Sequence, residues 1–213
     1  MRTRDRACAA AFLLLALPQV AAALPLISEL FYDATGSDDG KSFVELYGTP
    51  GTLLDDFRIE GVNGSNGDVT PTLVLSGVIP GDGLFVIADG LSDGTTSVLE
   101  ADLILNFDFQ NGPDSVQLLA PDGSVVDALG YGEFAPDEIF AGEGSPAPDA
   151  PADASLARWF ADIDTDDNAA DFTVSSPTPG SAALAVPEPA TGALVSAGLL
   201  GLAHGGRRRR ARR

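Results

Sequence analysis

Short apolar or alternating runs, separated by glycine, proline, aspartate and asparagine, are the feature that most limits how this chain can fold. From Leu26 onward no stretch keeps a 3.6-residue apolar period long enough for a substantial helix. The 24 glycines and 15 prolines among the 213 residues are typical of many turns between short elements. The pattern therefore predicts an all-β fold, an antiparallel β-sandwich or barrel.

Ten runs have the length and composition of strands. Two of the segments between them, 80–83 and 121–123, are turn sequences, because Pro fixes one backbone dihedral and Gly or Asp accepts a positive φ. The second turn predicts a hairpin. The predicted strands are 26–32, 42–47, 53–60, 72–75, 84–88, 98–105, 115–119, 125–131 and a weaker pair at 156–160 and 172–174.

Charge is distributed very unevenly along the chain. Nine of the 12 cationic residues lie in the first six or the last seven positions, which leaves only Lys41, Arg58 and Arg158 in between. Of the 31 acidic residues, only Asp5 and Glu188 belong to the two ends. The body between them holds the other 29, so its net charge is −26. Such a body repels phosphate backbones, and we expect no nucleic-acid partner. A solvated acidic coat is the simplest interpretation of this composition.

The N-terminus has the composition of a secretory signal peptide. Three arginines are followed by an apolar run at 9–17, by Pro18 and by the small residues 21–23. The run is too short to cross a hydrocarbon core of about 30 Å comfortably, which disfavours an uncleaved anchor. We expect signal peptidase to remove residues 1–23. The mature protein would then contain no cysteine, because Cys8 is the only one.

The C-terminus has three parts in order: Pro187-Glu188-Pro189, an apolar Gly-rich segment at 190–203, and a cluster of arginines. A short hydrophobic helix with a basic end would hold the body outside the membrane while the arginines stay on the cytoplasmic side. The arrangement resembles the PEP-CTERM sorting signal of Gram-negative bacteria. That resemblance implies that Pro187, Glu188 and Pro189 are recognised by an exosortase-type membrane protease, which removes the tail. A plain C-terminal anchor is the alternative.

The body carries a second resemblance. Residues 27–32, 43–47, 79–88, 114–119 and 125–127, followed by Ser-Leu-Ala-Arg at 155–158 and Pro-Thr-Pro-Gly at 177–180, resemble the bacterial lamin-tail domain. The resemblance implies an immunoglobulin-like antiparallel β-sandwich. Gly48 and Ala183 depart from it, since the family usually has Asn at both places. The expected domains are a signal peptide at 1–23, a lamin-tail-like sandwich at 24–183 and a sorting tail at 184–213, which includes the short hydrophobic helix.

Residues suited to catalysis are scarce. The only His is His204, in the predicted sorting tail, and the only Cys lies in the predicted signal peptide, so Ser-His and Cys-His hydrolysis are excluded for the processed protein. We therefore expect no enzymatic activity and no cofactor. Glu29 and Glu45 lie in strongly apolar runs, and we expect them to face solvent or to form an ion pair with Lys41 or Arg58.

Asp162, Asp164 and Asp166 alternate along the segment 162–168, and alternating carboxylates can converge on a hard cation such as Ca²⁺. Position six of this segment is Asp167 and position twelve is Thr173, so it is not an EF-hand loop. A solvated acidic loop is the alternative to a calcium site. Arg158 and Trp159 stand just before the segment. We expect Arg158 to reach an acid at the sandwich edge, with a partner or sugar platform as the alternative.

These observations favour an exported, non-catalytic protein of the cell surface or extracellular matrix, with a structural or adhesive role. Its expected partners are signal peptidase, an exosortase, exopolysaccharide or surface proteins and, before processing, the membrane. A calcium-dependent carbohydrate or surface adhesin is a second hypothesis. A third is an accessory module to secreted hydrolases, because lamin-tail domains are often attached to such enzymes.

Overall fold

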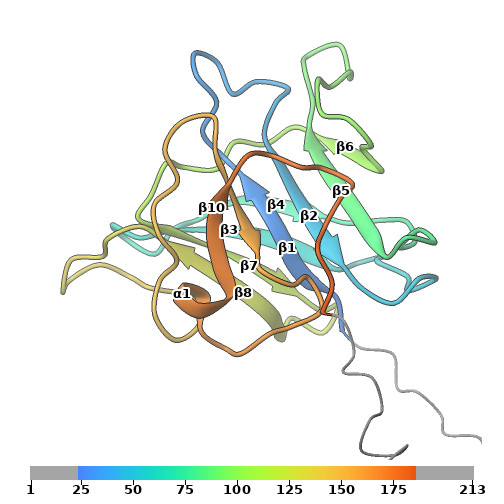
Figure 1. The fold of residues 1–213 in the computed structure, drawn as a ribbon. Coiled ribbons are helices and arrows are strands. Elements are labelled where there is room, and N and C mark those ends of the chain that lie inside the picture. The colour runs from blue at the N-terminus through green and yellow to red at the C-terminus, as the bar shows by residue number, and fades with distance from the viewer. Residues whose placement is uncertain (1–23, 186–213) are drawn as a thin grey trace, which may run out of the picture.

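The computed structural model describes residues 24–185 (Figure 1). The predicted signal peptide and the sorting motif Pro187-Glu188-Pro189 lie outside these described residues. Ten strands and one four-residue helix follow each other along the chain. They are β1 (Leu26–Phe31), β2 (Phe43–Tyr47), β3 (Arg58–Asn63), β4 (Val69–Val74), β5 (Leu84–Asp89), β6 (Leu103–Leu105), β7 (Asp114–Leu119), β8 (Val125–Tyr131), β9 (Ser155–Arg158), α1 (Asn168–Asp171) and β10 (Phe172–Ser175).

The strands form two sheets, so the all-β prediction is confirmed. One sheet has six strands in the order β10-β9-β1-β2-β5-β6, and the other has four in the order β4-β3-β7-β8. The arrangement is consistent with a β-sandwich. One part of the prediction was wrong: β6 pairs parallel to β5, so the six-stranded sheet is mixed rather than antiparallel. The chain reaches β6 through a long connection, which brings it in along the same direction as β5.

Most predicted strands match observed ones, and the differences lie at their ends. The run at 53–60 is strand only from Arg58, because Leu54 and Phe57 form the preceding turn. The run at 98–105 is strand only over its last three residues. The predicted hairpin at 121–123 is confirmed: the amide of Gly123 donates to the carbonyl of Ala120, and β7 pairs with β8 on either side.

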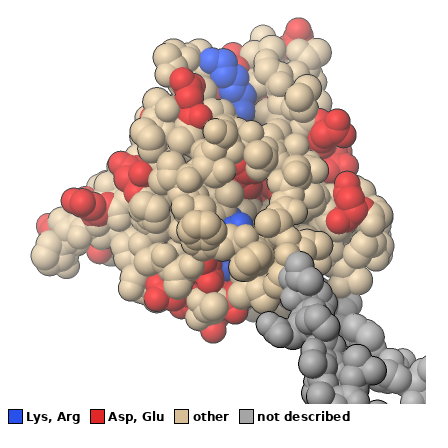
Figure 2. Space-filling model, in the orientation of Figure 1, with Lys and Arg blue, Asp and Glu red and all other residues tan. Residues whose placement is uncertain are grey.

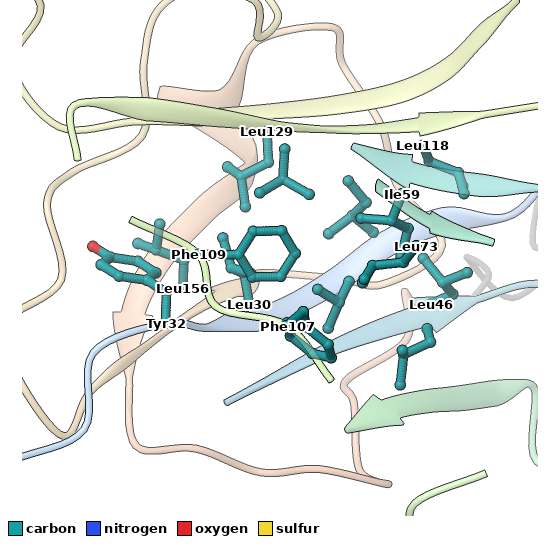
Figure 3. Packing of buried hydrophobic residues seen from close by; sticks show 14 of the residues in the cluster. Leu30, Tyr32, Leu46, Ile59, Leu73, Phe107, Phe109, Leu118, Leu129 and Leu156 are labelled. Carbon is teal, nitrogen blue, oxygen red and sulfur yellow. The ribbon is translucent and has the colours of Figure 1, made fainter. Parts of the chain in front are cut away.

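The core lies between the two sheets, where alternate residues of each strand meet (Figure 3). Leu30, Leu46 and Leu156 come from the six-stranded sheet, and Ile59 and Leu129 come from the other. All five side chains are fully buried. Successive side chains of a strand point to opposite faces of the sheet, so about every second residue of these strands contributes to the core.

Strands β1, β2 and β5 are buried on both faces, and most of their residues are apolar; the exceptions include the buried Ser28, Glu29, Glu45 and Asp89. Phe31, Phe43 and Val86 form a second, smaller cluster on the outer face of the six-stranded sheet, with Val98 packed against it. Beside this cluster, residues 176–185 cross the same face after leaving β10 (Figure 1). We call this segment the strap. It covers a sheet face that would otherwise be exposed to water.

The connection 132–154 follows the end of the four-stranded sheet. Ala147 forms an isolated bridge with Tyr131, and Ala147 and Ala150 are buried. Asn168, the first residue of α1, fastens this connection to β8. Its side-chain oxygen accepts from the amides of Gly130 and Glu143, at 2.8 and 2.9 Å, and its nitrogen donates to the carbonyl of Ala128 at 2.7 Å.

No helix among residues 24–185 has the length and apolar character needed to span a membrane.

Asn168→Ala is expected to destabilise the protein by about 3 kcal/mol or more, because it leaves several buried backbone groups without partners at a cost of ~1–3 kcal/mol each. Asn106→Ala is the matched control. Its side chain makes one bond, to the carbonyl of Gly90 at 3.2 Å, and the residue is exposed, so a loss below about 1 kcal/mol is expected. Urea unfolding measures both variants, and equal losses would contradict the role assigned to Asn168.

Candidate functional site

Glu29 and Glu45 are not on the solvent face, and the prediction that they face solvent or pair with Lys41 or Arg58 was wrong. Both are buried, at 2% and 0% exposure, on the outer face of the six-stranded sheet. They lie opposite each other on β1 and β2. A register irregularity between Ile27 and Glu29 turns Ser28 as well as Glu29 to this face, while Ile27 and Leu30 remain in the core.

The strap binds both carboxylates through its backbone. The amide of Thr178 donates to the two oxygens of Glu29 at 3.0 and 3.2 Å, and its hydroxyl donates to Oε2 at 2.8 Å. The amide of Gly180 donates to Oε2 of Glu45 at 2.7 Å. The hydroxyls of Ser155 and Ser28 complete the two sets, on Glu29 and Glu45 respectively. The glutamates therefore anchor the strap rather than meet a cation.

Beyond these anchors the strap runs beside the segment that follows β9. The amide of Ala161 donates to the carbonyl of Ala183 at 2.8 Å. The carboxylate of Asp162 accepts from the amide of Ala185 at 2.7 Å. Asp162, one of the three predicted calcium ligands, is thus used to hold the end of the strap.

Arg158 reaches acids at the sandwich edge, as predicted. Its guanidinium is 1% exposed and donates to both oxygens of Asp127 at 3.1 and 2.9 Å, to Asp171 at 2.9 Å and to Asp164 at 3.2 Å. It also donates to the carbonyls of Ile27 and Ile163. Both bonds to Asp127 come from Nη2, those to Asp171, Asp164 and Ile163 come from Nη1, and that to Ile27 comes from Nε, so every nitrogen of the guanidinium is engaged. Hydrogen bonds between charged groups are the stronger kind.

This network joins the two sheets at one end of the core. Arg158 belongs to β9 in the six-stranded sheet, whereas Asp127 belongs to β8 in the other. Asp127 also accepts from the amide of Ile27 on β1 at 2.6 Å. The ring of Phe172 lies 4.5 Å from the guanidinium carbon, which adds a cation–π contact. The sequence predicted an acid for Arg158 but gave no means of choosing Asp127 or Asp171 among 29 acidic residues of the body.

Asp127, Glu143 and Asp164 form the one group among residues 24–185 whose carboxylate oxygens are close enough together to hold a metal ion, within 4.8 Å of one another. Burial and the charges of Asp127 and Asp164 raise the pKa of Glu143 to about 8. Glu143 is therefore mostly uncharged at neutral pH. A cation at this position would share Asp127 and Asp164 with Arg158.

Of the three predicted calcium ligands, only Asp164 belongs to this group. Asp162 binds the strap, and Asp166 lies at a positive φ of 55° with its amide donating to Asp164. The segment bends so that Asp164 points to Arg158. Calcium binding stays a prediction. The carboxylates placed to hold an ion are those of Asp127, Glu143 and Asp164, and not those of Asp162 and Asp166.

A cleft of about 500 Å³ lies between the strap and the outer face of β9 and β10. Small side chains of the sheet form its base, the strap forms one side, and Trp159 lines it with a side chain that is 59% exposed. Its lining residues are Ser28, Glu29, Glu45, Ala157, Arg158, Trp159, Thr173, Ser175, Thr178 and 181–183.

A second cavity, of about 450 Å³, is lined by acids near the start of the connection from β1 to β2. Asp38, Asp89 and Asp108 are among its lining residues. Burial, with the charges of Asp38 and Asp89, raises the pKa of Asp108. Asp89 itself is occupied by the amides of Gly40 and Phe107, so its carboxylate stabilises the two loops that surround the cavity.

Comparisons with known proteins assign no family to the chain. No protein-family model matches it, no curated protein is found to be similar, and no solved structure is found to match. The resemblances to the lamin-tail domain and to the PEP-CTERM signal therefore rest on the motifs quoted for them.

Replacing Arg158 should be among the most destabilising single changes in the protein. Arg158→Met leaves Asp127 and Asp171 buried without a cation, and loss of one partner from a buried ion pair costs about 3–5 kcal/mol. Arg58→Met, which removes a partly exposed pair with Glu60, is expected to cost less than about 1 kcal/mol. Chemical denaturation gives both values. A small loss for Arg158→Met would contradict its role in joining the sheets.

Glu45 should make the protein less stable as the pH rises. Burial, with the nearby charge of Glu29, raises its pKa from 4.5 to about 7, against the opposing effect of the bonds from Ser28 and Gly180. A raised folded-state pKa means that the stabilising contribution is complete below about pH 4.5 and is lost as the pH rises through about 7. The loss is on the order of 3 kcal/mol, because a tenfold change in proton affinity corresponds to ~1.4 kcal/mol.

The measurement is the difference in unfolding free energy between wild type and Glu45→Gln at pH 5 and pH 8. The glutamine side chain of the variant does not titrate, so the wild type should lose stability relative to the variant across this range. Glu60→Gln, which changes a carboxylate on the other sheet, serves as the control. Parallel pH profiles for wild type and Glu45→Gln would contradict the prediction.

Proposed function

We propose that this chain is an exported, non-catalytic protein of the cell surface or extracellular matrix, with a structural or adhesive role. Its body would be a lamin-tail-like sandwich of the immunoglobulin type. Its tail would be recognised at Pro187-Glu188-Pro189 and removed by an exosortase-type membrane protease. The main support is the composition of the two ends, which resemble an export signal and a sorting signal, together with the two-sheet body between them.

The positions of the quoted motifs in the fold support the lamin-tail interpretation. Residues 43–47 form β2, residues 114–119 form β7, and residues 155–158 form β9. The Pro-Thr-Pro-Gly segment at 177–180 is the part of the strap that binds Glu29 and Glu45. Motifs that are distant in sequence thus contact one another, which gives each a structural reason to be present.

The engagement of the buried charged groups supports a non-catalytic role. Asp127 and Asp171 are bound by Arg158, and Glu29 and Glu45 are bound by hydroxyls and strap amides. A general acid or base must reach a substrate proton. These carboxylates are instead directed to groups of the protein itself, and they hold the sheets and the strap in place.

The strap connects the body to the predicted sorting signal. It is fastened at Thr178, Gly180 and Ala185, and Pro187 follows Ala185 by two positions. The chain therefore leaves the sandwich next to the motif that the protease would recognise. Removal of the tail beyond Pro189 would leave every contact of the strap intact.

The intact mass of the protein recovered from the outside of an exosortase-containing bacterium tests this proposal. We expect a mass that lacks residues 1 to about 23 and the segment beyond Pro189. A variant with Ala at 187–189 should keep its tail and remain with the membrane, whereas Glu60→Ala should be processed as the wild type. A wild-type protein that keeps its arginine cluster would contradict the matrix role, and turnover of ester, phosphate or glycoside substrates would contradict the non-catalytic role.

A further inference from the structure

The cleft between the strap and strands β9 and β10 has the features of a binding site. It is open to solvent and has a volume of about 500 Å³, within the range in which small-molecule sites are found. The outer face here carries Ala157, Thr173 and Ser175, whose side chains are too small to fill the space beneath the strap. Thr178 closes the cleft on the strap side. The bonds from the strap to Glu29 and Glu45 fix its position over the sheet, so the cleft is a fixed part of the fold.

Trp159 gives the cleft an aromatic wall. It follows β9 directly, and its backbone amide is held by the carbonyl of Asp171 at 2.8 Å. The side chain is 59% exposed although it belongs to the residue type that buries most surface. Its indole ring therefore keeps a large apolar area available beside hydroxyl groups. An aromatic face next to hydroxyls is complementary to a sugar ring, which has an apolar C–H face and polar edges.

The charges around the cleft select against acidic ligands. Its only cationic lining residue is Arg158, whose guanidinium is 1% exposed and already bound by three carboxylates. Glu29 and Glu45 lie at the base, and acidic residues are spread around the rim of this face, with only small areas of charged atoms near its centre (Figure 2). The body as a whole has a net charge of −26, which repels anions. An uncharged ring meets none of this repulsion.

We propose that this cleft binds an uncharged sugar unit, with Trp159 stacking on the ring and Thr173 hydrogen-bonding its hydroxyls. Ser175 and Thr178, whose hydroxyls donate to the carbonyl of Ser176 and to Glu29, would accept from the sugar hydroxyls. The inference deepens the proposed function and rests on it for the source of the sugar, a polysaccharide outside the cell. The strap contributes one wall, so the segment that leads to the sorting signal also completes the binding site.

The test uses the full chain and three defined oligosaccharides: cellotetraose and N-acetylchitotetraose, which are uncharged, and tetragalacturonate, which is acidic. Trp159 is the only tryptophan, so its indole N–H gives a single, assignable NMR signal. At least one uncharged probe is expected to shift this signal saturably, with a dissociation constant on the order of 1 mM or tighter. Tetragalacturonate is expected to leave it unchanged.

Variants separate binding from folding. Ligand-observed NMR should show a loss of affinity of roughly tenfold or more for Trp159→Ala, the amount expected from losing one aromatic stack. Thr173→Ile, which adds bulk to the cleft, should also abolish binding. Phe160→Ala changes a neighbouring aromatic residue that is 46% exposed and is not among the residues lining the cleft, so it should bind as the wild type. Circular dichroism confirms that each variant is folded.

Three outcomes would overturn the inference: no saturable shift with either uncharged probe, unchanged affinity in Trp159→Ala, or tighter binding of tetragalacturonate. None of them depends on export or tail removal. The intact-mass experiment tests those separately, so a failed sugar site and a failed proposed function are distinguishable.

Discussion

The buried guanidinium of Arg158 connects more parts of this fold than any other side chain described among residues 24–185. It binds Asp127 of the opposite sheet, Asp171 at the end of α1, and the carbonyl of Ile27 on β1. Removing a charge from water costs several kcal/mol, so these groups are stable in the interior only together. The position of β9 relative to β8, and with it the end of the core, depends on this mutual compensation.

A second set of buried charges holds the strap. Glu29 and Glu45 are carboxylates on an apolar sheet face, and each is stabilised by amides and hydroxyls rather than by a cation. Burial raises the pKa of both, to about 7 for Glu45. The attachment of the strap is therefore coupled to the protonation of the Glu29 and Glu45 carboxyl groups beneath it. The same attachment defines one wall of the cleft beside Trp159.

The proposed function follows from combining these features with the two ends of the sequence. The proposal of a non-catalytic role rests on the engagement of the buried charges in holding the sheets and the strap. The proposed sugar site requires no additional element, because the strap, the small residues of β9 and β10 and one exposed tryptophan form it. A matrix protein with such a site would attach to the polysaccharide that surrounds it.

The sequence by itself determined the mostly-β character, the approximate places of most strands and the hairpin at 121–123. These depend on local alternation and turn chemistry, which each short segment carries alone. It also indicated that Arg158 would meet an acid. Only the tertiary structure decided which acids, placed Glu29 and Glu45 under the strap, grouped the carboxylate of Asp164 with those of Asp127 and Glu143, and paired β6 parallel to β5. Each of these depends on contacts between segments distant in sequence, and among 29 similar carboxylates only their positions in space distinguish one from another.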